Sequence, residues 1–111
     1  MQKKLGGFIR HQDLRNYEVK TRDPVEGEYK GKKIVSMGPP SSGGVHVIEI
    51  LNILSQFELE GPADPRSIHL TASAMQAAFA DRAKYMGDTD FVSVPVETLI
   101  AKNTPLPRAL I

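Results

Sequence analysis

Short runs of β-branched residues between positions 18 and 37 predict strands rather than helices. Val19 and Thr21 suit a first strand, and a later run leads into Lys33-Ile34-Val35-Ser36-Met37. Gly27 and Gly31 are expected at turns that flank a short edge strand, whose lysines would discourage pairing with another sheet edge. We therefore expect short strands within residues 18–37.

Apolar residues dominate from about 44 to 58 and fall on nearly every side of the helix that their spacing predicts. Such a helix needs neighbours on more than one side, which a chain of 111 residues can scarcely supply by itself. His46, Glu49 and Asn52 interrupt the most apolar stretch, Val45 to Leu54, which is also too short to cross a bilayer. This segment therefore predicts packing partners beyond the chain and no membrane contact.

A three- and four-residue spacing of apolar side chains predicts a second helix from about 67 to 86. The stripe consists of Ile68, Ala72, Met75, Phe79, Ala83 and Met86. Several alanines beside it would let another element come close. Gly87 is expected to end this helix, and Pro95 to open a short one over 96–102. Strands followed by segregated helices indicate an α+β fold.

Composition excludes several functional classes. The chain is 41% hydrophobic and 24% charged, with a formal net charge of +1, so it offers neither a basic surface for nucleic acid nor an acidic tail. It has no cysteine, which excludes a disulfide framework, a thiol nucleophile and thiolate metal sites. The start, Met1 to Gly7, carries charge without an apolar core and is not a signal peptide.

A run of prolines, serines and glycines separates the last predicted strand from the buried helix: Pro39, Pro40, Ser41, Ser42, Gly43 and Gly44. Proline cannot continue a sheet, and serine is a good N-cap for the helix that follows. Ser41 and Ser42 are also the obvious candidate nucleophiles, but Gly-x-Ser-x-Gly is absent and no histidine-plus-acid arrangement accompanies them. We interpret the run as a structural corner, with ligand contact as the alternative.

The backbone amides of residues 42–44 offer one such contact, because amides at a helix start can bind an anion. The glycine spacing of a dinucleotide loop and the Gly-Lys-Ser/Thr of a P-loop are both missing, so the phosphate interpretation has little support.

Titratable residues form no recognisable catalytic or metal-binding pattern. The histidines have no i, i+4 pair and no nearby pattern of carboxylates: His11, His46 and His69. The aspartates lack the order of a calcium loop and are expected to cap and turn: Asp81, Asp88 and Asp90. Asp81 and Arg82, within a helix, favour a structural ion pair with other elements over a catalytic acid. The residues alone predict no catalytic group, metal site or cofactor.

Four stretches together resemble the gamma-glutamyltranspeptidases. They are Gly6-Gly7 with Asp13-Leu14-Arg15-Asn16-Tyr17; Pro24-Val25-Glu26-Gly27-Glu28-Tyr29-Lys30-Gly31; Ser36-Met37-Gly38-Pro39-Pro40-Ser41-Ser42-Gly43-Gly44 leading to Glu49-Ile50-Leu51-Asn52-Ile53-Leu54; and Ala80-Asp81-Arg82-Ala83-Lys84-Tyr85-Met86-Gly87-Asp88-Thr89-Asp90-Phe91. Their order and spacing agree with that family over about residues 5–102. Two departures are Gly38, where many relatives have proline, and Pro105 with Pro107, which interrupt a helix that the family usually continues.

The resemblance implies an N-terminal-nucleophile hydrolase, a four-layer αββα sandwich made as one precursor that cleaves itself into two subunits. It implies gamma-glutamyltransferase and glutathione hydrolase activity without a cofactor. The N-terminal threonine of the small subunit would attack a gamma-glutamyl amide such as that of glutathione, with its own α-amine as base and backbone donors for the oxyanion. The glutamyl group would pass to water or to an amino acid. A periplasmic or extracellular location is implied as well.

On this resemblance, residues 1–111 are a partial domain, the C-terminal portion of the large subunit, and the small subunit is its partner. The nucleophilic threonine is expected downstream, because the sequence around Thr104 does not resemble the family's processing site. No substrate-binding residue of the family maps onto the chain, so the run from Pro39 to Gly44 marks the fold and the chain alone is expected to be inactive. Two alternatives remain: a related acylase or capsule transpeptidase, and a stand-alone oligomeric module without enzymatic activity.

Overall fold

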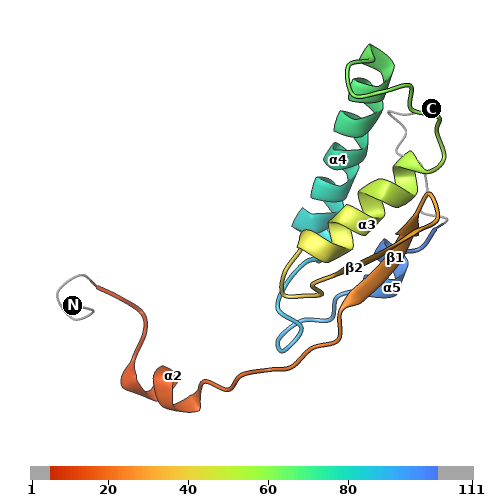
Figure 1. Ribbon diagram of the computed structural model, residues 1–111. Coiled ribbons are helices and arrows are strands. Elements are labelled where there is room, and N and C mark those ends of the chain that lie inside the picture. Colours follow the sequence, from red (N-terminus) through yellow and green to blue (C-terminus); the bar gives the residue numbers. More distant parts are fainter. Residues whose placement is uncertain (1–5, 103–111) are drawn as a thin grey trace.

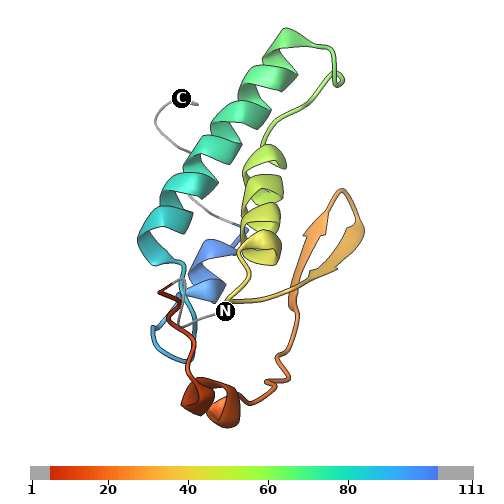
Figure 2. The same cartoon turned by 90° about the vertical axis from the view of Figure 1, so that its left-hand side faces the viewer.

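Helix α3 lies at the centre of the computed structural model, which describes residues 6–102 (Figure 1). The elements follow the order α2 (His11–Asn16), β1 (Val25–Tyr29), β2 (Lys32–Ser36), α3 (Gly43–Leu54), α4 (Pro65–Tyr85) and α5 (Val96–Leu99). The β1–β2 hairpin packs on one side of α3 and α4 on the other, while α5 packs against α3 (Figure 2). This arrangement of helices on a small antiparallel sheet confirms the predicted α+β class.

The hairpin pairs β1 with β2 in antiparallel register, with Val25 opposite Ser36 and Tyr29 opposite Lys32. Lys30 and Gly31 form its turn, and both have positive φ, 48° and 74°. A two-residue turn of this handedness matches the right-handed twist of the strands, and glycine takes this conformation without steric cost. The turn predicted at Gly31 is therefore confirmed.

Gly27 lies inside β1, opposite Ile34, so the predicted turn at this position is wrong. Its role is close packing, because a Cβ added there would lie 2.7 Å from Cγ2 of Ile48 on α3. The first strand predicted around Val19 and Thr21 is also wrong. Residues 17–24 have no regular structure and are exposed. β-branched residues alone do not make a strand, and residues 6–102 provide no strand that pairs with this segment.

Helix α3 is buried on two sides, as its all-round apolar pattern predicts. Towards the hairpin and α5 it forms one cluster, made of Val25, Val45, Ile48 and Leu99. Towards α4 it forms a second, made of Ile53, Leu54, Leu70 and Ala74. The helix ends at Leu54, four residues before the predicted end at 58, because the chain turns through residues 55–57.

Helix α4 begins at Pro65, and Asp64 is its N-cap, whose Oδ2 accepts a hydrogen bond from the backbone N–H of Ser67 at 2.6 Å. Its small-residue face packs on α3, with Ala74 and Ala78 fully buried. The predicted apolar stripe lies on other sides of the helix, and Phe79 within it is 59% exposed. Alanines let α3 approach more closely than the larger side chains would allow.

Residues 6–24, with α2, form an arm that extends away from the body and is exposed along its whole length (Figure 1). Arg22 connects the arm to the loop after α4. Its guanidinium lies 2.9 Å from a carboxylate oxygen of Asp90 and donates to Oγ1 of Thr89 at 2.8 Å. Because the arm extends away from the body, the molecule is elongated, with extents of 55 × 29 × 23 Å.

Helix α5 covers Val96–Leu99 and is shorter than the predicted 96–102, although Pro95 does precede it. The predicted interruption at Pro105 and Pro107, and Thr104, lie outside the described residues. Among the helices of residues 6–102, none combines the length and apolarity that crossing a membrane requires.

Candidate functional site

The Pro-Pro-Ser-Ser-Gly-Gly run forms the corner between β2 and α3. Ser42 occupies the N-cap position of α3, but its side chain makes no capping hydrogen bond. The Oγ of Ser41 instead accepts from the backbone N–H of Gly43 at 3.3 Å. One of the amides considered for anion binding is thus already paired, which weakens the case for a ligand at this helix start.

Gly44 fixes how tightly this corner closes. A Cβ at position 44 would clash with the carbonyl oxygen of Met37 and would lie 2.6 Å from Cγ2 of Val25. Only glycine lets α3 start directly beside the strand that precedes it. The last residue of the run therefore has a steric explanation that needs no ligand.

Arg82 of α4 supplies the partner that the Ser42 side chain would otherwise lack. Its Nε donates to the Oγ of Ser42 at 3.1 Å, across 40 positions of sequence. Asp81 and Arg82 were predicted to form an ion pair with other elements, and this contact involves Arg82. Within the described residues, the contact with Ser42 is a hydrogen bond to a hydroxyl, not an ion pair.

Two shallow hollows flank the corner. One, of about 400 Å³, lies between the corner and the end of α4 and is lined by Pro40, Ser42, Arg82, Ala83, Met86, Gly87 and Asp88. The other, of about 410 Å³, lies where the arm meets the hairpin and includes Lys20, Arg22, Met37 and Pro39. The basic groups around them already have partners: Arg82 bonds Ser42, Arg22 pairs with Asp90, and Lys20 pairs with Glu18. Neither hollow therefore presents an unengaged basic group for catalysis.

A buried histidine–glutamate pair lies one turn further into α3. Nδ1 of His46 is 2.7 Å from Oε2 of Glu49, and the two residues are 6% and 0% exposed. His46 therefore does have a carboxylate neighbour, contrary to the expectation of scattered histidines. The i, i+3 spacing on one helix was the sequence signal for it, and the apolar surroundings concealed it.

The environment of this pair favours its uncharged form. Burial raises the pKa of Glu49 to about 8, and hydrogen bonding and repulsion from Asp81 add to this effect. Burial also lowers the pKa of His46, and the nearby Arg82 guanidinium lowers it further, against a smaller opposing effect of Asp81. Asp81 and Arg82 of α4 thus disfavour an anion on Glu49 and a cation on His46.

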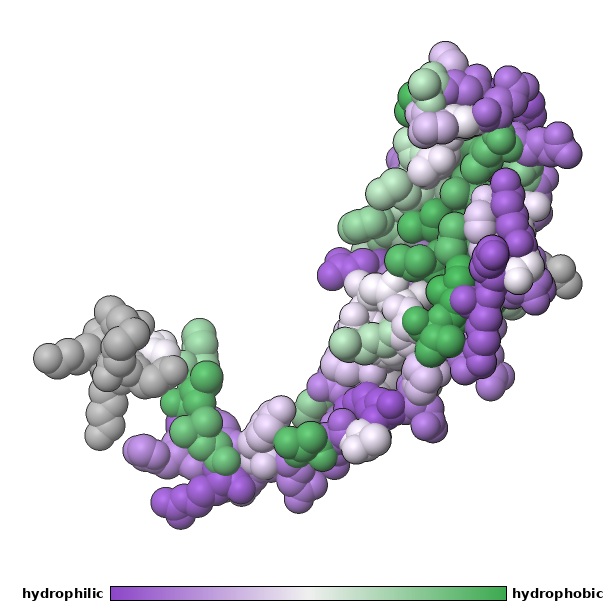
Figure 3. Space-filling model, viewed as in Figure 1, coloured by the Kyte–Doolittle hydropathy of each residue, from purple (hydrophilic) through white to green (hydrophobic). Residues whose placement is uncertain are grey.

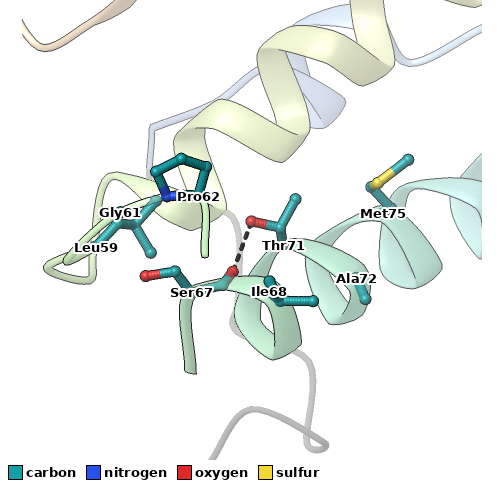
Figure 4. Close-up of a pocket in the computed structure, with 8 residues that line it drawn as sticks. All are labelled: Leu59, Gly61, Pro62, Ser67, Ile68, Thr71, Ala72 and Met75. Carbon is teal, nitrogen blue, oxygen red and sulfur yellow. Dashed lines mark hydrogen bonds between the residues drawn. The ribbon is translucent and has the colours of Figure 1, made fainter. Parts of the chain in front are cut away.

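A larger apolar hollow, of about 550 Å³, lies beside the first half of α4 and is open to solvent. Figure 4 shows Leu59 and Pro62 from the preceding loop facing the α4 side chains of Ile68, Ala72 and Met75. Both hydroxyl groups on its wall are engaged: Oγ1 of Thr71 donates to the carbonyl of Ser67 at 2.8 Å, and Oγ of Ser67 accepts from the backbone N–H of Glu60 at 3.1 Å. The hollow has an apolar lining and no reactive side chain.

The described residues bring together no group of three or more histidine, cysteine or acidic side chains that could hold a metal. Asp88 and Asp90 lie around Arg22 in the loop after α4, where the backbone N–H of Asp90 donates to Oδ1 of Asp88 at 3.0 Å. This is the turn role expected of them. His11 and His69 are exposed and lie on α2 and α4.

Solved structures with the same arrangement define the class of the fold. A gamma-glutamyltranspeptidase of Helicobacter pylori superposes with a TM-score of 0.84 and 54% sequence identity, over 91% of this chain and 30% of that one. A gamma-glutamyltranspeptidase from Pseudomonas nitroreducens, complexed with L-DON, superposes with a TM-score of 0.81 at 33% sequence identity. A cephalosporin acylase from Bacillus halodurans superposes with a TM-score of 0.79 at 30% sequence identity. The chain therefore has the α+β fold of part of an N-terminal-nucleophile hydrolase.

Sequence comparison narrows this class. The sequence model of the gamma-glutamyltranspeptidase family matches residues 1–108, and the chain belongs to that family. It is 45% identical over 103 residues to the glutathione hydrolase proenzyme of Escherichia coli strain K12. It is 44% identical over 99 residues to the acylase ACY 1 proenzyme of Pseudomonas sp. strain SE83.

The matched regions cover most of this chain but little of the relatives. They cover 89% of this chain and 17% of the Escherichia coli proenzyme, and 87% of this chain and 18% of the Pseudomonas one. The chain therefore spans less than a fifth of the length of these curated relatives.

Proposed function

We propose that this chain is part of a gamma-glutamyltransferase and glutathione hydrolase, and that it forms the C-terminal portion of the large subunit. The observation that carries the proposal is the superposition on the Helicobacter pylori enzyme, at 54% identity and a TM-score of 0.84 over 91% of the chain. The complete enzyme would transfer the gamma-glutamyl group of glutathione or a similar amide to water or to an amino acid.

The placement in the large subunit has its own support. The same segment occupies 30–31% of the two solved gamma-glutamyltranspeptidase chains but only 17–18% of the curated proenzymes. The solved chains are thus little more than half as long as the precursors. This proportion fits a precursor cut into two subunits, with this segment in the longer one.

The exposed apolar surface supports a role as one part of a larger body. Ile68, Met75 and Phe79 on α4 are 54%, 45% and 59% exposed. Figure 3 shows apolar side chains gathered over the body formed by α3 and α4, and also along the arm. Contiguous apolar surface usually marks a face that another protein element covers. The remainder of the large subunit and the small subunit are the proposed partners.

In this proposal the chain has a structural role, and the nucleophilic threonine comes from the small subunit. The corner from Pro39 to Gly44 would set the start of α3 relative to the hairpin, and Arg82 would hold α4 to that corner. These residues would act on the reaction only through the layers they position. The periplasm or the extracellular space is the proposed location of the whole enzyme.

A segment exchange tests the proposal. Residues 6–102 replace the matching segment of the Escherichia coli glutathione hydrolase proenzyme, and the chimera is assayed for self-cleavage and for release of anilide from a gamma-glutamyl anilide. We expect a processed, active chimera, and an inactive one when the segment carries Gly44→Ala. A chimera with the Gly43→Ala segment is the matched control and should stay active. A well-expressed chimera that is neither processed nor active would contradict the proposal.

The isolated chain provides a second test. We expect the purified 111 residues to show no turnover of the same anilide, and turnover at the rate of the complete enzyme would overturn the assignment.

An acylase is the second candidate, and the similarity to the acylase ACY 1 proenzyme and to the cephalosporin acylase favours it. The two candidates share this segment, so the small subunit must distinguish them. Assays of the complete protein with a gamma-glutamyl anilide and with a cephalosporin side-chain amide would decide which substrate is preferred.

A further inference from the structure

The contact between α3 and α4 contains a titratable pair that the proposed function does not use. His46 and Glu49 lie on α3, 2.7 Å apart through Nδ1 and Oε2, with 7% and 1% of their side chains exposed. Nε2 of His46 is buried without a hydrogen-bond partner, and Oε1 of Glu49 is buried with no donor facing it, so the neighbouring Asp81 can bond Glu49 only through a proton that one of the two carboxyl groups carries. Buried polar atoms are normally paired, so this pair is an exception that calls for a physical account.

The charged groups that act on the pair come from α4. Asp81 lies next to Glu49, and the guanidinium of Arg82 lies near His46. The side of α3 that faces β1, β2 and α5 is apolar instead, with Val45 and Ile48 packed against Val25, Ile34 and Leu99. Two more titratable residues of α4 lie in this region: Tyr85 packs against that apolar cluster, and Lys84, within electrostatic reach of Asp81, is exposed to solvent.

This placement makes the ion-pair form of His46 and Glu49 unfavourable. A histidinium would lie beside Arg82, and a glutamate anion beside Asp81, so each charge would meet a like charge as well as the cost of burial. In the uncharged form one hydrogen bridges Nδ1 and Oε2. Either the carboxyl O–H donates to the imidazole, or the imidazole N–H donates to the carbonyl oxygen of the protonated acid.

We propose that His46 and Glu49 form a pH-sensitive contact between α3 and α4, which stays closed while the pair is uncharged and loosens when alkaline pH removes its proton. Loss of the proton leaves a carboxylate with an unpaired oxygen in an apolar interface, opposite Asp81. The carboxylate must then reach water, and the start of α3 separates from α4 to admit it. The inference rests on this interface alone and does not depend on the proposed enzymatic function.

The pH range follows from the two residues together. Between pH 6.5 and about 8 the unfolded chain has lost the Glu49 proton that the folded chain keeps, so stability falls as pH rises. Below pH 6.5 the unfolded chain also gains a His46 proton that the folded chain resists, which offsets the effect of Glu49. We therefore expect the unfolding equilibrium constant to rise by up to tenfold per pH unit between 6.5 and 8, with little contribution from the pair just below that range.

Carbon NMR of the full chain with labelled glutamate side chains tests the proton directly. The Cδ resonance assigned to Glu49, by its loss in Glu49→Gln, should titrate near pH 8 rather than near 4.5. A midpoint near 4.5 overturns the proposal, whether the residue is hydrated in a folded chain or the chain is unfolded.

Urea unfolding between pH 6 and 9 tests the consequence. The amide of Glu49→Gln can accept from His46 Nδ1 without titrating, so this variant should lose the decline in stability above pH 6.5. Glu58→Gln makes the same chemical change at an exposed position and should keep the decline. Equal pH dependence in all three chains would refute the proposal, and the NMR midpoint of the unsubstituted chain decides if Glu49→Gln does not fold.

Discussion

The Nε of Arg82 on α4 donates a hydrogen bond to the Oγ of Ser42, 3.1 Å away at the first residue before α3. This contact joins the Pro-Pro-Ser-Ser-Gly-Gly corner to the last turns of a helix that begins more than twenty residues later. Ser42 has no capping hydrogen bond to its own helix, so its hydroxyl serves tertiary packing instead. A serine at a helix start thus has a role here that its sequence position does not reveal.

We expect Arg82→Ala and Ser42→Ala to destabilise the chain by a similar amount, about 0.5–1.5 kcal/mol each. Arg82 is exposed, which favours the lower end of that range. Because both changes remove the same hydrogen bond, the double variant should cost less than the two single costs combined. Urea denaturation of the unsubstituted chain, the two single variants and the double variant gives the coupling free energy between Arg82 and Ser42. Strictly additive costs would show that the contact contributes nothing.

Gly44→Ala should destabilise the chain strongly, by about 3 kcal/mol, because the added methyl group meets the Met37 carbonyl and Cγ2 of Val25. Gly43→Ala is the matched control. The nearest atom to its Cβ would be Ser41 Oγ at 3.5 Å, an ordinary contact, and alanine is the better helix former by up to about 1 kcal/mol. Thermal melts followed by circular dichroism compare the two, and equal melting temperatures would contradict the packing at this corner.

Asn52→Asp tests the connection between α3 and α5. Asn52 is 3% exposed, and its Nδ2 donates to the carbonyl of Ile100 at 2.8 Å. An aspartate of the same shape would place an acceptor, and at neutral pH a charge, against that carbonyl, at a cost of about 3 kcal/mol. Gln76→Glu makes the same chemical change at an exposed position of α4 and should be nearly neutral. The cost of Asn52→Asp should shrink in acid, where the carboxyl is protonated, and a loss independent of pH would argue against this account.

Asp81→Asn should lower the pKa of Glu49 from about 8 without returning it to 4.5. The aspartate contributes a hydrogen bond and a charge, but burial is the larger cause and remains. The pKa of His46 should fall as well, since Asp81 is the one group that raises it among those acting on His46. NMR titration of both side chains measures the two shifts. A Glu49 midpoint that does not move would mean that Asp81 is not in contact with it.

Sequence periodicity predicted the two main helices and the multi-sided burial of α3, because these depend on local spacing. The alanines beside the apolar stripe of α4 were expected to let another element come close, and Ala74 does pack against α3. Apolar residues lie on two faces of that helix, and spacing alone does not tell which face meets α3. The close approach of α3 selects the face with Ala74 and Ala78, and Phe79 is left exposed.

The corner was also located correctly, since prolines and glycines mark it directly. Its partners were not, because Arg82 lies 40 positions away and nothing local indicates which residue it reaches. Glu49 presented a related difficulty. In the sequence, a glutamate within an apolar helix looks like an interruption of the apolar pattern. Its burial, together with the neighbouring Asp81 of α4, explains why it is held uncharged.

The order of contacts along the chain has a consequence for how the structure is made. The hairpin packs on α3, which follows it directly, and α3 packs on α4, the next helix. Such contacts between sequence neighbours form quickly, since little chain must be closed into a loop. During synthesis the hairpin and α3 can associate before α4 has left the ribosome. The Asn52–Ile100 hydrogen bond, which spans 48 positions, must form after them.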